Sequence, residues 1–307
     1  MNMSQLTKTT AVVALSMGLC LSQAAAADTV VVSSKIDTEG SVLGNIIYLA
    51  LEDAGIPVED RIQLGATNIV RDAIIAGEID IYPEYTGNGA FFFDRADGSE
   101  WNDASDGYEL VKELDYDAHN IVWLQPAPAN NTWAISVREE LANEHGLETL
   151  EDLADYLNAG GDFRFAGSAE FVESESALPA FQDAYGFTLS SDQLVVLSGG
   201  NTAATMRAAA QQTDGVNAAM TYGTDGGLKA LNLRVLTDTL GVQPVYEPAP
   251  IIRESVLEQY PEIEEILAPL FAAMDLETLQ EMNGNVAVNG FDPVEVARDF
   301  IERHQNQ

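Results

Sequence analysis

The chain has 307 residues, of which 49 are acidic and 14 are basic, so its formal net charge is −35 at pH 7. Nucleic acid is repelled by such a surplus of negative charge and is excluded as a partner. The acids are spread along the chain, which indicates a surface adapted to high salt, where screening quenches self-repulsion. An acidic binding face is the alternative. Hydrophobic residues make up 46% of the sequence, which is enough for the cores of two domains.

The first 27 residues have the pattern of a signal peptide. Lys8 supplies a basic start, residues 11–21 form a short apolar segment, and residues 24–27 are small and suit cleavage. The apolar segment is too short to cross a bilayer, which takes about 20 residues; a buried N-terminal helix is the alternative. Cys20, the single cysteine, follows Leu19 where a lipoprotein signal requires a small residue. We therefore expect a soluble periplasmic protein without a lipid anchor, and a mature chain without a thiol.

Strands and helices alternate from residue 28 onward. The pattern predicts a strand at 28–34, a helix capped by Asp37 or Thr38, a strand at 58–64, a helix ending at Gly77, and a short strand at 79–81. This alternation is typical of a doubly wound α/β sheet.

The stretch 77–89 is the most distinctive in the chain. Pro83 and Gly87 argue against regular structure, so we predict a loop that carries Tyr85 and Asn88 at the carboxyl end of a strand. Ligands bind at such ends in open α/β sheets. A tyrosine-rich turn without a ligand is the alternative.

A second α/β unit follows a predicted crossing at 126–133, which is rich in Pro and Asn. Before that crossing, the pattern predicts a helix at 104–118 and a strand at 121–124. After it come strands at 133–137, 163–167, 193–197, 216–222 and 233–236, with helices near 150–157, 177–185 and 202–212. A return crossing is predicted at 243–250, and the remainder is helical. The predicted fold is α/β: residues 28–130 plus 241–307 form one doubly wound lobe, residues 131–240 form the other, and a ligand cleft lies between them.

Signals for metal, cofactor or covalent chemistry are missing from the sequence. The three histidines lie far apart, at positions 119, 145 and 304, and show no ligand spacing, so neither a metal site nor a cofactor is expected. The turn 198–201 resembles a phosphate-binding turn, but an ordinary helix entry explains it better.

Aromatic residues fall where the predicted cleft should be. Tyr85 and Tyr222 end strands, while Trp133 and Tyr246 lie at the two crossings. Rings around a cavity bind a cation through their π faces, and a methylated nitrogen suits them because it cannot donate hydrogen bonds. The alternative is that each ring merely anchors its own loop.

The sequence resembles the substrate-binding proteins of osmoprotectant ABC importers, the ProX, OpuCC and OsmF group. The most specific match is the run Gly77-Glu78-Ile79-Asp80-Ile81-Tyr82-Pro83-Glu84-Tyr85-Thr86-Gly87. Supporting matches in order along the chain are Ser34-Lys35 with Glu39, Leu64-Gly65-Ala66-Thr67, Asn130-Asn131-Thr132-Trp133-Ala134, Glu170-Phe171, and Tyr222-Gly223-Thr224-Asp225-Gly226. The resemblance implies a type II two-lobe fold and an aromatic cage for a trimethylammonium group, formed by Tyr85, Trp133, Tyr222 and Tyr246.

The resemblance also implies polar contacts to the rest of the ligand. The family binds the betaine carboxylate with a lysine matching Lys35, a hydroxyl residue and an arginine, but this chain has Asn88 and Ser174 at the last two positions. Losing a guanidinium removes the strongest carboxylate contact, so a hydroxyl or neutral tail would be accepted as readily. Asn131 and Glu170 complete the predicted polar set. The alternative for Lys35 is an ion pair between the lobes with an acid such as Glu170.

The expected function is periplasmic capture of a quaternary ammonium osmoprotectant, such as choline or glycine betaine, by a monomer that delivers it to the permease subunits of an ABC importer. Closure of the lobes would be a shift toward the state that holds the ligand on both sides, without covalent chemistry. The alternatives are a receptor for another solute or for signalling, and a periplasmic enzyme on the same fold.

Overall fold

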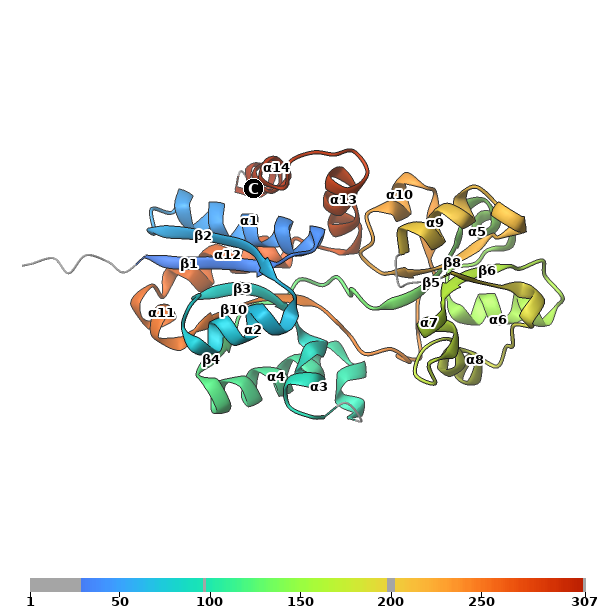
Figure 1. The fold of residues 1–307 in the computed structure, drawn as a ribbon, viewed down its shortest axis with the longest axis horizontal. Helices are drawn as coiled ribbons and strands as arrows, with labels where there is room; N and C mark the ends of the chain where they lie inside the picture. Colours follow the sequence, from blue (N-terminus) through green and yellow to red (C-terminus); the bar gives the residue numbers. More distant parts are fainter. Residues whose placement is uncertain (1–28, 96–97, 198–201, 306–307) are drawn as a thin grey trace, which may run out of the picture.

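The structure, a computed structural model, describes residues 29–95, 98–197 and 202–305. The predicted signal peptide at 1–27 and the turn at 198–201 lie outside the described residues. The chain forms two α/β lobes, each built on a five-stranded sheet, as predicted (Figure 1). In the part of the chain that the structure describes, no helix is both long and apolar enough to cross a membrane.

The sheet of the first lobe has the strand order β2-β1-β3-β10-β4. β1 is parallel to β2 and β3, whereas β10 is antiparallel to β3 and β4. The strands are β1 (Val30–Lys35), β2 (Val58–Gly65), β3 (Ile81–Tyr85), β4 (Ile121–Trp123) and β10 (Pro248–Arg253).

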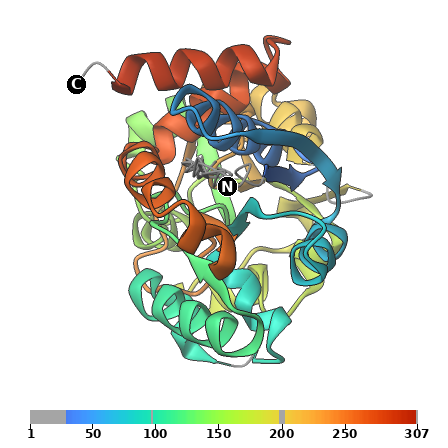
Figure 2. The same ribbon diagram turned by 90° about the vertical axis from the view of Figure 1, so that its left-hand side faces the viewer.

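Helices cover both faces of this sheet. One core, with Leu43, Phe271 and Phe300, joins it to α1, α12, α13 and α14, and a second core, with Trp101 and Trp123, joins it to α2, α3 and α4. Figure 2 shows α14 and α4 at opposite sides of the lobe. The helices are α1 (Thr38–Asp53), α2 (Thr67–Ala76), α3 (Gly89–Phe92), α4 (Ala104–His119), α11 (Glu254–Gln259), α12 (Glu262–Ala272), α13 (Leu276–Ala287) and α14 (Pro293–Gln305).

The second lobe repeats this arrangement with the strand order β7-β6-β8-β5-β9. β6 is parallel to β7 and β8, and β5 is antiparallel to β8 and β9. Phe165 and Phe171 lie in the core under α6, α7 and α8, while Met206 and Leu228 lie in the core under α9 and α10. The strands are β5 (Trp133–Arg138), β6 (Phe165–Ser168), β7 (Leu194–Leu197), β8 (Ala218–Tyr222) and β9 (Leu233–Val235). The helices are α5 (Glu139–His145), α6 (Leu150–Asn158), α7 (Ala169–Glu173), α8 (Leu178–Tyr185), α9 (Thr202–Ala210) and α10 (Gly227–Ala230).

The chain passes between the lobes twice, through residues 124–132 and 236–247 (Figure 1). Each crossing leads directly into the antiparallel strand of the sheet that it enters, β5 or β10. The crossings also bond to each other: the Tyr246 N–H donates to Asn130 Oδ1 over 2.8 Å, and the Asn131 N–H donates to the Tyr246 carbonyl over 2.9 Å. The two crossings therefore form one hydrogen-bonded strip between the lobes.

Helix α13 makes a third connection between the lobes. It packs in the core of the first lobe and lies beside α10 of the second (Figure 1). Asn283 Nδ2 donates to the carbonyl of Thr224, in the loop after β8, over 2.9 Å. The backbones of Gly284, in α13, and Gly226, just before α10, nearly touch. A Cβ on Gly226 would lie 2.2 Å from the nitrogen of Gly284. Only glycine fits this contact.

Two predictions that relied on proline are wrong. Strand β3 continues through Pro83 to Tyr85, where we predicted a loop, and the predicted return crossing at 243–250 contains the start of β10. Pro83 lies directly opposite Pro250. The pair takes a position that needs no hydrogen bond between β3 and β10, so the missing N–H groups do not weaken this ladder. On its other side, the Pro250 carbonyl accepts from the Leu124 N–H over 2.9 Å.

Candidate functional site

A cavity of about 990 Å³ lies between the two lobes. All four predicted cage residues line it: Tyr85, Trp133, Tyr222 and Tyr246. The predicted polar residues Asn88, Asn131, Glu170 and Ser174 line it as well. Lys35 is not among the lining residues. The structure thus brings every predicted site residue except this lysine to the cavity wall, and Lys35 lies behind Tyr85, 4.5 Å from the centre of its ring. Their contacts with a ligand stay a prediction.

The aromatic side chains reach the cavity from three parts of the molecule. Tyr85 is the last residue of β3 in the first lobe. Trp133 and Tyr222 lie directly opposite each other in the β5–β8 pair of the second lobe. Tyr246 comes from the second crossing. Such an arrangement can close around a small ligand only when both lobes meet on it.

Trp133 is held by the core of the second lobe, and the rings of Tyr222 and Tyr246 stay neutral. Trp133 packs edge-on against Phe171, with ring centroids 5.8 Å apart. Burial raises the pKa of the hydroxyls of Tyr222 and Tyr246, so neither is ionised at physiological pH. The rings therefore keep the electron-rich faces that attract a cation.

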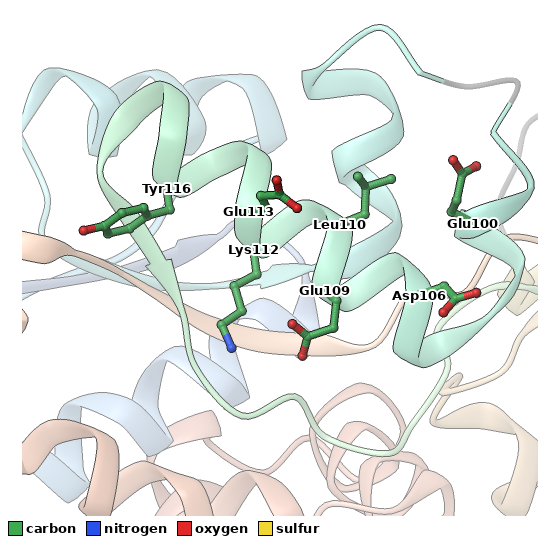
Figure 3. A pocket seen from close by; sticks show the side chains of 7 residues that line it. All are labelled: Glu100, Asp106, Glu109, Leu110, Lys112, Glu113 and Tyr116. Carbon is green, nitrogen blue, oxygen red and sulfur yellow. The ribbon is translucent and has the colours of Figure 1, made fainter.

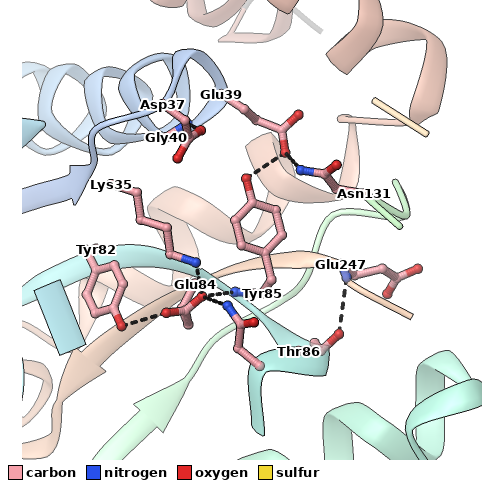
Figure 4. Close-up of polar contacts among 11 residues, drawn as sticks. Lys35, Asp37, Glu39, Gly40, Tyr82, Glu84, Tyr85, Thr86, Asn131 and Glu247 are labelled. Atoms are coloured by element: carbon pink, nitrogen blue, oxygen red, sulfur yellow. Dashed lines mark hydrogen bonds and ion pairs between the residues drawn. The ribbon is translucent and has the colours of Figure 1, made fainter. Parts of the chain in front are cut away.

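Tyr85 is fixed from two sides (Figure 4). Its hydroxyl donates to Glu39 Oε1 over 2.7 Å, and the Lys35 ammonium lies 4.5 Å from the centre of its ring. The residue is 7% exposed, and burial raises the pKa of its hydroxyl well above the ordinary value. Since the lysine occupies one face of the ring, the other face is the one left for a ligand.

Lys35 belongs to a buried network centred on Glu84, which is fully buried (Figure 4). The carboxylate accepts hydrogen bonds from the Lys35 ammonium, the Tyr82 hydroxyl, the Tyr85 N–H and Asn88 Nδ2. The lysine thus pairs with an acid of its own lobe and not with Glu170. This network satisfies charges that would otherwise be costly to bury.

Glu39, in the first turn of α1, is a site residue that the prediction missed. It is 5% exposed, lines the cavity, and accepts from Tyr85, from Asn131 Nδ2 at 3.2 Å and from Asn283 Nδ2 at 2.5 Å. Burial raises the pKa of its carboxyl group. An acid in the first turn of a helix ordinarily stabilises the helix dipole at the surface, so the residue type gave no signal for its burial, and the only pointer was its place beside Lys35 in the family match.

The acidic residues that the second lobe presents to the cavity are more exposed than the α1 glutamate that lines it. Asp225 accepts from the Tyr222 N–H over 2.8 Å, and burial raises the pKa of its carboxyl group. Glu170 is exposed at the start of α7. The Ser174 hydroxyl lies 3.0 Å from that of Ser176.

A second hollow, of about 550 Å³, runs along α4 (Figure 3). Its side chains come from one helix and the turn before it, and they spread apart instead of converging on one point (Figure 3). Among the described residues, no group of three or more His, Cys, Asp or Glu is arranged to hold a metal ion. The cleft between the lobes is therefore the candidate site.

Comparisons with known proteins agree with this geometry. Residues 28–303 match the OpuAC family model, described as the substrate binding domain of an ABC-type glycine betaine transport system. The glycine betaine-binding protein YehZ of Escherichia coli is 55% identical over 278 residues, which are 91% of each chain. A glycine-betaine-binding protein of Pseudomonas aeruginosa is 32% identical over 293 residues, 94% of this chain and 91% of the relative.

A solved structure supports the fold as well. Unliganded YehZ from Escherichia coli superposes with a TM-score of 0.88 at 55% identity, covering 90% of this chain and 99% of that one. The family resemblance seen in the sequence motifs and the predicted two-lobe fold are both confirmed. The chain belongs to the OpuAC family of ABC-transporter substrate-binding proteins.

Proposed function

We propose that this protein captures a quaternary ammonium solute in the cleft and presents it to the permease of an ABC importer. The observation that carries the proposal is the placement of Tyr85, Trp133, Tyr222 and Tyr246 on one cavity between two lobes. Two relatives that match nearly the whole chain are named for glycine betaine binding, which places this solute class first.

Binding in such a site needs no covalent step. Each well-placed ring face contributes about 0.5–2 kcal/mol toward a desolvated cation. A small solute cannot touch all four rings in a cavity of about 990 Å³, so the lobes must close on it. The ligand then acts by favouring the closed state over the open one. We propose a binding protein without enzymatic activity.

In the proposed complex, the four aromatic residues surround the ammonium group, while Asn131, Glu170 and Ser174 face the rest of the ligand. Lys35 and Asn88 act through Glu84, which fixes the first-lobe side of the site. The proposal also keeps the lobe boundaries at 130/131 and 240/241, export to the periplasm, and a monomeric state. The membership of the strands in the two sheets supports those boundaries.

Calorimetric titration with choline and with glycine betaine tests the proposal. Tyr222→Ala should lower the affinity for whichever solute binds by about 2- to 30-fold, because one ring face is lost. Tyr116→Ala is the matched control, since this exposed tyrosine lies on α4 away from the cleft. Unchanged affinity in Tyr222→Ala would contradict the cage, and turnover of the solute would indicate an enzyme.

A further inference from the structure

The charges that face the cleft are all of one sign. Four lining side chains are carboxylates, Asp37, Glu39, Glu170 and Asp225, and no lysine or arginine is among the lining residues that the structure describes. Glu39 is buried and Asp225 is half-buried, so salt screens these two carboxyl groups less than it screens charges at the surface.

No lysine or arginine in the described lining of the cleft can receive an anionic group of a ligand. The ammonium of Lys35 is bound by Glu84 and lies over the Tyr85 ring, outside the lining of the cleft. At position 174, the side chain that faces the cleft is a serine hydroxyl already in contact with Ser176.

The amide groups of the cleft are partly engaged within the protein. Four amide side chains line it, and each donates at least one hydrogen bond within the protein: Asn88 to Glu84, Asn131 to Glu39, Gln243 to the Ser176 carbonyl, and Asn283 to both Glu39 and the Thr224 carbonyl. Each amide also has an acceptor oxygen, and Asn283 has used both of its N–H groups.

One of those acceptors lacks a partner. Asn283 Oδ1 is buried and accepts no hydrogen bond, while the residue is 5% exposed and lines the cleft. The orientation of the amide is fixed, because its nitrogen faces two acceptors, Glu39 Oε2 and the Thr224 carbonyl. A buried acceptor without a partner costs free energy, and a ligand that donates a hydrogen bond would remove that cost.

We propose that the cleft selects a solute of net positive charge, a quaternary ammonium whose tail is a neutral hydrogen-bond donor, over the zwitterion that carries a carboxylate at the same place. The inference rests on the proposed function and names its substrate class. A ligand carboxylate would have to leave water for a site whose own carboxylates repel it and whose described lining offers no lysine or arginine to receive it. A hydroxyl or carboxamide tail meets acceptors instead.

The experiment compares two solutes of nearly the same size and shape. Glycine betaine carries a carboxylate, while its carboxamide has the same heavy-atom framework, an N–H donor and a net charge of +1. Calorimetry of the full mature chain at about 1 M salt screens the general field of the acidic surface and leaves the local contacts. We expect the carboxamide to bind about tenfold more tightly or better, and choline to follow the carboxamide.

Two variants assign the effect to the cleft. Glu39→Gln should narrow the preference for the carboxamide, whereas Glu113→Gln, which removes an equal charge on α4 outside the cleft, should leave it unchanged. Equal affinity for the two solutes, or tighter binding of glycine betaine, would overturn the charge selection while leaving the proposed function intact. Binding of neither solute nor choline would refute the proposed function and this inference with it.

Discussion

The two lobes contribute to the cleft in different ways. On the first lobe, Tyr85 is held by Glu39 and Lys35, and the network around Glu84 leaves little freedom. On the second lobe, Glu170 is exposed and the Ser174 hydroxyl contacts that of a neighbouring serine, Ser176. A site whose side chains are ordered before binding loses less conformational entropy when the ligand binds. The first lobe is therefore the side on which we expect a ligand to dock first, and the second lobe the side that adapts during closure.

The largest expected effect concerns the buried network of the first lobe. Glu84→Ala leaves the Lys35 ammonium buried without its partner, which should lower the free energy of unfolding by about 3–5 kcal/mol. Glu170→Ala on the exposed side of the second lobe should change it by about 0.5 kcal/mol or less. Thermal unfolding of both variants measures the contrast, and similar melting temperatures would remove the distinction between the lobes.

A smaller effect should separate the two cage tyrosines. Tyr85→Phe takes one donor from the buried Glu39 carboxylate and should lower stability by about 1–3 kcal/mol. Tyr222→Phe removes a half-buried hydroxyl with no carboxylate partner and should change stability less. Denaturant unfolding of the two variants makes the comparison; a larger loss from the Tyr222 change would reverse it.

The pH dependence should be the smallest and most specific effect. The pKa of Glu39 is raised by burial in the free protein, and the groups that face its carboxyl are Thr224, Tyr85, Asn283, Asp37 and Asn131. A bound cation favours the charged form of this carboxyl. Affinity for choline should therefore rise as the pH rises through the pKa of Glu39, with release of protons.

The same group affects stability with the opposite sign. Because its folded-state pKa lies above the ordinary value of 4.5, the free protein should lose stability as the pH rises through that window. Melting temperatures of wild type and Glu39→Gln across pH 4–8 isolate this contribution as their difference. A difference that does not change with pH would show that Glu39 does not titrate there.

Much of the fold could be predicted because hydrophobic periodicity marks most of its elements. The doubly wound order and the two crossings follow from that pattern and from the positions of Pro and Asn. Strand β10 was missed because Pro248 and Pro250 are typical of loops, and nothing local shows that Pro250 will face Pro83 across a ladder. Pairing of this kind is decided by residues far away in the sequence.

The site was predictable to a similar degree and for a similar reason. Local sequence predicts the strand ends and crossings on which the aromatic residues lie. Because these positions border the cleft of a two-lobe fold, the meeting of the four rings at one cavity could be predicted. The ion-pair and hydrogen-bond partners of the charged groups could not be predicted. Lys35 and Glu84 are 49 residues apart, and Asn283 and Glu39 are 244 apart, so only the folded chain shows which charge is neutralised and which faces the ligand.

The glycine contact between α13 and α10 has a consequence for anyone who wishes to watch the protein work. The backbones of Gly226 and Gly284 nearly touch, so we expect this edge of the cleft to move little and closure to turn about it. We expect the far rim, across the cavity from α13, to travel the longest distance. A pair of dyes placed there on opposite lobes would convert solute capture into a change in energy transfer, whereas a pair beside α13 would stay nearly silent and serve as the internal reference.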